Sequence, residues 1–456
     1  MKICLFICFV FVFAVSFASA QTPETVPQLQ LVQPQGATAP PPVITLQDAL
    51  SRARQVDVGY QAAMTDVAVA TEDRFQAKVA RRPSVSHLTE YLGTQGNGRT
   101  PNGRYVTTDG VHVYRSWGIV HQDLTPDLFF NNTYRRAEAL EALAAARVEI
   151  AQRGLAVTVT RDYYALVTSQ RKYVTAQQSL QQSQRFLQIS QQQEQAGQVA
   201  HSDVVKAQLQ AQQQQQNLQE AVLSMGQTRL NLAVLLFPDL NENFTVVDDL
   251  DSEMILPPFP DIQALGERQN PDLRVAQQTL RGATQDVHIA RNALLPSIAI
   301  DGNYGIEANA FALHSRAAAF PQEGELPNLG YYVDAKFLLP IFDWGARRSK
   351  VRQAEFKERE AQFVLTQTQK QLIANLYLFY NEALTARAAV LGLRRAADLA
   401  AESLRLINLR YQAGESTALE VVDAQNALIQ ARNAYDDAQT RYRVGITTLQ
   451  SVTGPF

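Results

Sequence analysis

The chain has 456 residues, of which 46% are hydrophobic and 19% are charged, and its formal net charge is −3. This balance argues against a nucleic-acid-binding protein, which would carry a strongly basic domain or patch. The two cysteines, Cys4 and Cys8, lie at the very start of the chain. The rest of the chain therefore has no disulfide, no thiolate metal site and no cysteine nucleophile.

Residues 1–20 have the pattern of a signal peptide. Lys2 precedes the apolar run "ICLFICFVFVFAVSF", and the small residues Ala18, Ser19 and Ala20 precede Gln21. We predict cleavage there, because the apolar run is short for the alternative, a membrane anchor. Residues 21–45 are rich in proline and glutamine, which predicts an extended lead-in.

From residue 46 the chain follows one plan twice. The segments 124–238 and 341–455 align without a gap, so that Tyr163 corresponds to Tyr380 and Pro238 to Pro455. We therefore divide the chain into a first repeat, residues 46–238, a link, residues 239–260, and a second repeat, residues 261–456. Each repeat is predicted to contain a helix, a strand hairpin, a long helix, a tip and a further helix.

A seven-residue spacing of apolar side chains predicts the helices. Four stripes carry it: Val159, Leu166, Tyr173, Leu180 and Leu187; Val204, Ala211, Leu218, Met225 and Leu232; Leu376, Ala383, Val390, Ala397 and Leu404; Val421, Leu428, Tyr435, Tyr442 and Leu449. This spacing is typical of a narrow coiled-coil seam. It predicts long helices over about 132–195 and 346–412, roughly 95 and 100 Å in length. Shorter helices are expected at about 47–81, 202–236, 261–294 and 418–450.

Two segments, about 84–122 and 297–339, change to a period of two, which predicts strand hairpins. In the second repeat Ile298, Ile300, Tyr304 and Ile306 alternate with Ala299, Asp301 and Asn303. In the first repeat Val111, Val113, Trp117 and Ile119 are expected on the apolar face, opposite His112, Tyr114 and Ser116. Such strands suit either an outer-membrane barrel or soluble hairpins packed on another element. Four strands cannot close a membrane barrel, so the barrel interpretation requires an oligomer.

Four segments carry a resemblance to a known family: "ALLPSIAI" (293–300), "LLPIFDWGARRSKVRQAE" (338–355), "QEQAGQVAHSDVVKAQ" (193–208) and "LRYQAGESTALEVVDAQ" (409–425). With their order and duplication, the chain resembles the outer membrane efflux protein family, the TolC-like exit ducts. The resemblance implies a mainly helical fold with a small β part. Three chains would form a twelve-stranded outer-membrane barrel above an α-helical tunnel in the periplasm.

The resemblance also implies partners and a site. The partners are two further copies of the chain, outer-membrane lipid, a periplasmic adaptor protein and an inner-membrane pump or exporter. Gly197 and Gly414 would end the long helices in a left-handed conformation at the tips that meet the adaptor. Asp203, Glu420 and Asp423 would line a constriction at the periplasmic mouth, and Tyr411 would hold it closed. Nine carboxylates in a trimer would attract cations.

Each of these site residues also has an ordinary structural interpretation. Thr417 to Glu420 has the pattern of a capping box, and Asp203 stands where a helix N-terminus favours an anion. Tyr411 extends the stripe that contains Leu404. The arginine partner found in some relatives falls at Ser416, so a lock in this chain must differ.

The sequence offers no catalytic set, cofactor motif or metal site. The six histidines, His87, His112, His121, His201, His288 and His314, show no metal-ligand spacing. We therefore expect an export duct rather than an enzyme. The alternative is a periplasmic coiled-coil scaffold without a pore.

Overall fold

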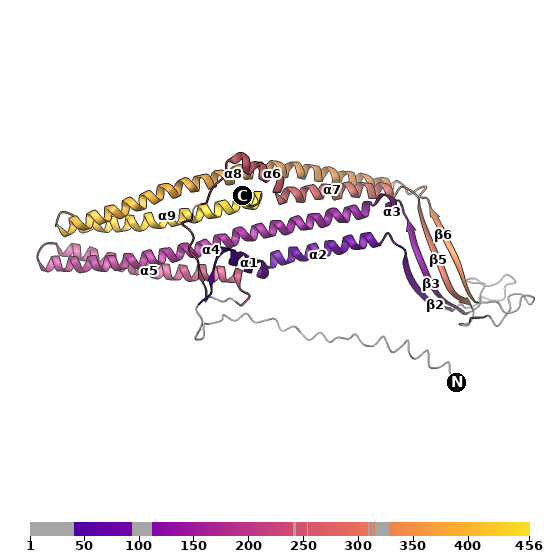
Figure 1. The fold of residues 1–456 in the computed structure, drawn as a ribbon, viewed down its shortest axis with the longest axis horizontal. Coiled ribbons are helices and arrows are strands. Elements are labelled where there is room, and N and C mark those ends of the chain that lie inside the picture. The colour runs from indigo at the N-terminus through magenta and orange to yellow at the C-terminus, as the bar shows by residue number, and fades with distance from the viewer. Residues whose placement is uncertain are drawn as a thin grey trace, which may run out of the picture.

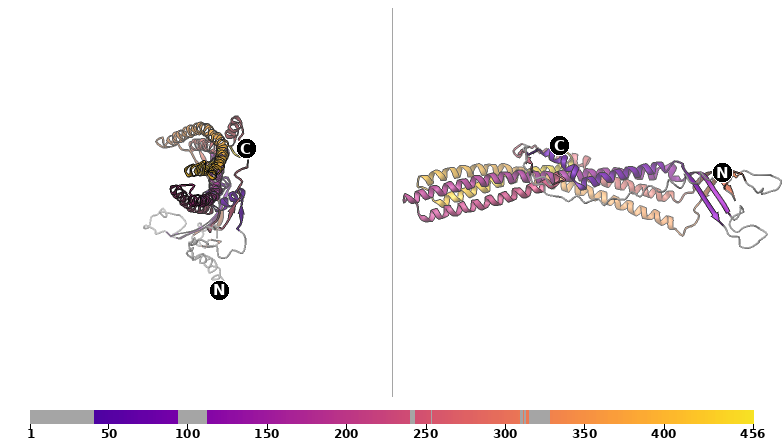
Figure 2. Two further views of the ribbon diagram at one scale, coloured as in Figure 1. Left: turned by 90° about the vertical axis from the view of Figure 1, so that its left-hand side faces the viewer. Right: turned by 90° about the horizontal axis from the view of Figure 1, so that it is seen from below.

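The computed structural model describes residues 41–93, 112–239, 243–252, 254–308, 311, 313–314 and 328–456. The molecule is a long bundle of helices with a sheet at one end (Figure 1 and Figure 2), and the predicted fold class, mainly helical with a small β part, is confirmed. The predicted signal peptide, residues 21–40 of the lead-in and Val111 lie outside the described residues. Among the described residues, no helix is long and apolar enough to cross a membrane.

The two repeats contain corresponding elements. The first repeat consists of α1 (Leu46–Val56), α2 (Val58–Val79), β2 (Ser84–Gly93), β3 (His112–Leu124), α3 (Pro126–Phe130), α4 (Asn132–Gln195) and α5 (His201–Leu236). The second consists of α6 (Phe259–Gln269), α7 (Pro271–Asn292), β5 (Ser297–Ala308), β6 (Leu329–Leu338), α8 (Ala346–Gln412) and α9 (Ala418–Thr453). Two short strands, β1 (Val43–Ile44) and β4 (Thr245–Val246), pair in parallel and join the lead-in to the link.

The long helices α4 and α8 set the length of the molecule. In Figure 1, α2 and α5 run along successive parts of α4, and α7 and α9 do the same along α8. Every side chain of the four predicted seven-residue stripes is buried or half-buried. The spacing therefore identified the packed face of each helix correctly.

The predicted helices at about 47–81 and 261–294 are each two helices, which corrects the sequence-based expectation. The breaks fall at Asp57 and Asn270, whose ψ angles of 119° and 123° are extended. Asp57 Oδ1 accepts the backbone N–H of Tyr60 at 2.6 Å, and Asn270 Oδ1 accepts that of Leu273 at 2.8 Å. Both side chains therefore cap the helix that follows them.

The four main strands form one antiparallel sheet in the order β2-β3-β5-β6. The register pairs Ile119 with Asn303 and His121 with Asp301. Residues directly opposite each other point to the same face, so Ile119 and Trp117 share the polar face with Asn303 and Asp301. The prediction that they lie on the apolar face was wrong, because alternation within one strand does not determine which of its faces matches a neighbour's.

The other face of the sheet carries large apolar side chains that the chain itself does not cover. The most exposed of these are Val85, Tyr304, Tyr331, Val333 and Phe337, with exposed fractions from 60% to 82%. On the polar face, by contrast, Arg115 pairs with Glu90 and Glu307 at 3.0 and 2.8 Å. The sheet is therefore two-sided, with its polar groups paired on one face and apolar groups presented on the other.

Candidate functional site

The end of the molecule opposite the sheet contains the two turns that connect α4 to α5 and α8 to α9 (Figure 1). Gly197 and Gly414 have φ angles of 72° and 78°, so both predicted left-handed glycines are confirmed. After each glycine a backbone N–H returns to the helix: Gln198 to the Gln193 carbonyl and Glu415 to the Arg410 carbonyl, both at 2.8 Å. These are Schellman motifs, which require a residue that tolerates positive φ.

Tyr411 connects the two hairpins close to this end. It lies in the last turn of α8, is 4% exposed, and packs edge-on against Phe186 of α4 with ring centroids 5.0 Å apart. Its hydroxyl lies 2.9 Å from Ser190 Oγ of α4. Because Ser190 donates its own proton to the Phe186 carbonyl, the Tyr411 hydroxyl donates to Ser190. Tyr411 is thus both a stripe residue and a polar link between hairpins.

Burial is the main reason that the pKa of the Tyr411 phenol is raised. The hydrogen bond with Ser190 opposes this shift, and the nearby negative charge of Asp203 adds to it. The phenol is therefore neutral in any physiological medium and remains a hydrogen-bond donor.

Asp203 lies in the first turn of α5, and its side chain is 24% exposed. Its Oδ1 atom is 3.4 Å from Lys206 Nζ, three residues along the helix. Lys206 was not predicted as a partner of Asp203. Lys206 partly offsets the charge of Asp203, so the three predicted acids are not electrostatically equivalent.

Glu420 is exposed in the first turn of α9. Its backbone N–H donates to Thr417 Oγ1 at 3.3 Å, so Thr417 caps the helix as the sequence suggested. Its carboxylate, however, accepts a hydrogen bond from Ser416 Oγ at 2.6 Å. This bond is the main cause that lowers the pKa of Glu420, and Arg410 and Thr417 contribute. Ser416 thus contacts the Glu420 carboxylate directly.

Asp423 is exposed one turn further along α9 and, within the described residues, has no hydrogen bond or ion pair. It shares a helix face with Glu420, since the two are three residues apart. Within the described part of the chain, no hydrogen bond or ion pair joins Asp203 to either acid of α9. One chain therefore supplies two adjacent acids on α9 and a separate, partly paired acid on α5.

A cleft of about 410 Å³ lies between the two hairpins beside Tyr411. Three arginines line it: Arg185 from α4, Arg405 from α8 and Arg432 from α9. Arg405 forms a two-point contact with Glu402, with distances of 2.8 and 2.7 Å. The cleft is polar and carries more positive than negative charge.

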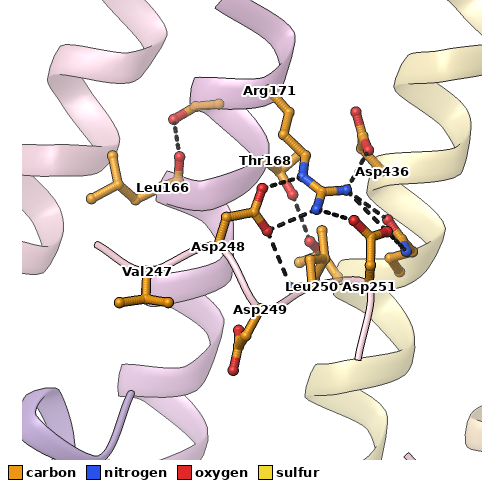
Figure 3. A network of polar contacts seen from close by, with 12 residues as sticks. Leu166, Thr168, Arg171, Val247, Asp248, Asp249, Leu250, Asp251 and Asp436 are labelled. Atoms are coloured by element: carbon orange, nitrogen blue, oxygen red, sulfur yellow. Dashed lines mark hydrogen bonds and ion pairs between the residues drawn. The ribbon is translucent and has the colours of Figure 1, made fainter. Parts of the chain in front are cut away.

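A second cross-repeat contact lies about halfway along the bundle, at a level that we call the waist. Here Arg171 of α4 binds both the link and α9 (Figure 3). Its guanidinium lies 2.6 Å from Asp248 Oδ2 and 2.7 Å from Asp251 Oδ2. On the α9 side it contacts Asp436 Oδ1 at 3.3 Å and Gln439 Oε1 at 3.1 Å. One side chain therefore holds together three segments that are distant in sequence.

We call residues 243–252 of the link the strap, because both hairpins hold it. Arg443 of α9 donates to the carbonyls of Asp249 and Ser252 at 2.7 and 2.6 Å. The hydroxyl of Tyr163 on α4 donates to the Val247 carbonyl at 2.7 Å. The strap also contributes Phe244 and Leu250 to the largest apolar cluster of the molecule. The strap is thus held to the first repeat by apolar and polar contacts and to α9 by polar contacts.

These contacts of the waist were not predicted from the sequence. The acids in "VDDLDSE" (247–253) were a signal, since a short link with several carboxylates needs cations nearby. Nothing local indicates which cations, because Arg171 precedes Asp248 by 77 residues. Within the described residues, no group of His, Cys, Asp or Glu is arranged to hold a metal ion.

Comparison with known proteins agrees with this architecture. Residues 264–455 match the family described as outer membrane efflux protein. OprJ, an outer membrane protein of Pseudomonas aeruginosa, is 27% identical over 190 residues, which are 41% of this chain and 37% of OprJ. The pyoverdine export outer membrane protein OpmQ of Pseudomonas putida is 26% identical over 307 residues, 65% of this chain and 62% of OpmQ. The matched regions thus span less than two thirds of either relative.

The fold is similar to that of solved outer membrane channels. The crystal structure of CmeC of Campylobacter jejuni matches with a TM-score of 0.75 and 17% sequence identity, over 90% of this chain and 85% of CmeC. At this identity the likeness concerns the fold alone.

Proposed function

Because residues 264–455 match the outer membrane efflux protein family, we propose that the chain is an exit duct, a channel that passively conducts substrates across the outer membrane of a bacterium. The observation that carries the proposal is a four-stranded sheet with one apolar, uncovered face, joined to helices of 64 and 67 residues. The sheet would lie in the outer membrane and the helices would extend into the periplasm. Substrates would pass unchanged, so the protein would not be an enzyme.

The edges of the sheet support assembly of three copies. Within the described residues, β2 and β6 each have a neighbour on one side only. Backbone N–H and C=O groups left unpaired in lipid cost several kcal/mol each, so open sheet edges do not persist there. We infer that β6 of one copy pairs with β2 of the next, and three copies give a closed barrel of twelve strands.

The tips support a periplasmic gate. Tyr411 and Ser190 hold the two hairpins of one chain together, and Glu420 and Asp423 present carboxylates beside this link. In a three-fold arrangement these acids, with Asp203, would form a negatively charged ring that favours cations. Separation of the hairpins at Tyr411 would widen the ring.

The same region would receive the partners. We infer that the tips at Gly197 and Gly414 meet a periplasmic adaptor protein, which links the duct to an inner-membrane pump or exporter. The cleft with Arg185, Arg405 and Arg432 gives this end a positively charged surface for an acidic segment of that adaptor.

The test is separation of inner and outer membranes on a sucrose density gradient, from cells that express the full chain. We expect the protein in the dense outer-membrane fraction, released by detergent and not by high salt. Recovery as soluble periplasmic protein would contradict the proposal and favour a coiled-coil scaffold whose hairpins remain in water.

A further inference from the structure

The junction between the sheet and the helices contains a pocket that the proposed export function does not use. Its volume is about 230 Å³, and it lies between the strand-to-helix turns of the two repeats. Pro126 and Asp127 of the first repeat form one wall, and Pro340 and Arg347 of the second form another. Ser297 and Leu338, which pair at the helix-proximal end of the sheet, also line it. The pocket thus marks the level at which the sheet ends.

Two hydrogen-bond donors at this pocket have no acceptor. The Arg347 Nη1 and Asn292 Nδ2 atoms are buried and have no hydrogen-bond partner, although both residues line the pocket. A buried donor without an acceptor costs about 1–3 kcal/mol, and more when it is charged. An acceptor that reached these two donors would remove this cost, and an anionic one suits the guanidinium best.

The two acids nearest to the pocket already have partners. Asp127 Oδ1 accepts the backbone N–H of Thr133 at 3.0 Å. Asp343 accepts the backbone N–H groups of Gly345 and Arg347 at 3.1 and 3.0 Å. The Arg347 guanidinium is 3.8 Å from Asp343 through its Nε atom, a distance too long for a hydrogen bond. These acids order the turns, and Arg347 Nη1 remains without an acceptor.

The pocket lining contains one acid, Asp127, and one cation, Arg347, whereas the first two turns of α8 beside it are basic. Four of the first seven residues of α8 are cations, Arg347, Arg348, Lys350 and Arg352, and none is an acid. Cations at the N-terminus of a helix oppose the helix dipole and are locally unfavourable. An anion bound beside Arg347 would reduce this conflict.

Large apolar side chains next to the pocket are almost fully exposed. Ile341, Phe342 and Trp344 have exposed fractions of 88%, 73% and 90%, and the rings of Phe342 and Trp344 stack edge-on with centroids 4.8 Å apart. Trp344 adopts a φ of 56°, which is uncommon for a residue other than glycine. In the first repeat, Phe129 and Phe130 are likewise 72% and 52% exposed. Aromatic residues at this density are typical of a membrane–water interface.

From these observations we propose that the pocket at Arg347 binds the headgroup phosphate of an anionic phospholipid in the periplasmic leaflet of the outer membrane. The phosphate oxygens accept hydrogen bonds from Arg347 and Asn292, and Ile341, Phe342 and Trp344 lie against the upper acyl chains. The neighbouring cations select lipids with net negative charge over zwitterionic ones. This assignment rests on the proposed outer-membrane location of the sheet.

The test measures lipid binding to the full chain purified in detergent. Short-chain phosphatidylglycerol, phosphatidylcholine with the same acyl chains, and inorganic phosphate are titrated separately, and the rise in melting temperature is followed. We expect phosphatidylglycerol to stabilise the protein at lower concentration than phosphatidylcholine, with little effect of inorganic phosphate. Arg347→Gln should weaken the phosphatidylglycerol effect about tenfold, because a charge-assisted hydrogen bond is lost.

Arg359→Gln is the matched control. Arg359 is an exposed arginine on the same helix, its guanidinium lies 4.8 Å from the centroid of the Phe356 ring, and it is not part of the pocket. This variant should bind phosphatidylglycerol like the unmodified chain, and Arg347→Lys, which keeps the charge but not the planar fork, should be intermediate. Arg347→Lys also covers the case in which Arg347→Gln fails to fold.

Three results would overturn the proposal: equal stabilisation by phosphatidylcholine, equal stabilisation by inorganic phosphate, or equal losses in Arg347→Gln and Arg359→Gln. Failure of the proposed function looks different, because the unmodified chain would then not be recovered in the outer membrane. A protein that is recovered there and shows no lipid preference would contradict only the pocket assignment.

Discussion

The waist and the tip both join the first repeat to the second, but by different means. At the waist, Arg171 contacts three carboxylates and the strap adds its own apolar side chains to a cluster of fourteen buried residues. At the tip, a hydroxyl–hydroxyl bond between Tyr411 and Ser190 and a side-chain amide bond between Gln210 and Asn426 accompany a cluster of five buried residues from both repeats. We infer that the hairpins would separate more easily at the tip, where their hydrogen bonds are between neutral groups, than at the waist, where Arg171 binds carboxylates.

The carboxylates of the two regions also differ in how they are stabilised. At the waist, burial raises the pKa of Asp436, whereas the hydrogen bond from Arg171 lowers that of Asp251. At the tip, the acids of α9 are exposed, and Glu420 is stabilised by hydroxyl groups instead of a cation of the other hairpin. Ion pairs therefore connect the segments of the waist, whereas the carboxylates of α9 at the tip are exposed to solvent.

Removal of the Arg171 side chain charge should have the largest effect. In Arg171→Met the carboxylates of Asp248, Asp251 and Asp436 lose their common cation, and Asp436 is left buried and unpaired. Because the site is partly exposed, we expect a destabilisation of about 2 kcal/mol, less than for a fully buried pair. Thermal unfolding of the purified protein in detergent measures it.

Asp436→Asn is the matched variant for that experiment. It removes a carboxylate whose pKa burial already raises, and Arg171 keeps Asp248 and Asp251, so the melting temperature should fall much less. An equal fall in both variants would mean that Arg171 acts by packing and not as the common cation of the waist.

The tip should respond to loss of one hydroxyl by a change in gating. Tyr411→Phe keeps the ring contact with Phe186 but removes the bond to Ser190, worth about 1 kcal/mol. If the tip is the gate, the ratio of open to closed time in single-channel recordings should rise about fivefold. Ser190→Ala should give a similar rise, because it removes the same bond.

Tyr442→Phe is the corresponding change at the waist. Its hydroxyl donates to the Met254 carbonyl at 2.8 Å, so this variant loses one tyrosine hydrogen bond of α9, as Tyr411→Phe loses one of α8. It should leave the ratio of open to closed time unchanged. Equal gating changes at Tyr411 and Tyr442 would remove the distinction between the tip and the waist.

Elements with a local pattern were predictable from the sequence, and contacts between distant segments were not. The seven-residue spacing located α4 and α8, and the duplication located both Gly197 and Gly414. The break at Asp57 was missed because an aspartate is common within helices, although at Asn270 the following proline was a signal.

The features that were not predicted are contacts between distant residues, which alternation and periodicity do not determine. The face to which Trp117 points depends on the register of β3 with β5. Ser190 is 221 residues from Tyr411, and Asp248 is 77 residues from Arg171. Within the candidate gate, the acids and the tyrosine were predicted from the sequence. Their partners Lys206, Ser416 and Ser190 became known only from the structure.

The acids of α9 should contribute more to ion selectivity than the acid of α5. Glu420→Asn combined with Asp423→Ala should weaken cation preference in bilayer recordings, because these carboxylates are exposed and have no cation bound to them. Asp203→Asn should have a smaller effect, since Lys206 already offsets part of its charge. Glu402→Gln, which removes an exposed acid paired with Arg405 further from the tip, is the control and should leave selectivity unchanged. Unchanged selectivity in the α9 double variant would exclude these acids from the aperture.

The smallest expected effect is on the pH at which Glu420 loses its charge. This pH tests whether the acids of the tip are exposed to solution, in contrast to those of the waist. The pKa of Glu420 is lowered from its ordinary value of 4.5, chiefly by Ser416. Its charge is therefore kept as the pH falls to 4.5 and is lost only below it. In Ser416→Ala this shift is reduced, so the charge should be lost at a higher pH.

The measurement uses bilayer recordings in an Asp203→Asn, Asp423→Asn background, where Glu420 is the remaining acid of the three. The cation preference should disappear at a higher pH in Ser416→Ala than in its parent. Coincident profiles would mean that Ser416 does not contact Glu420 in the assembled channel, and that the tip adopts another arrangement there.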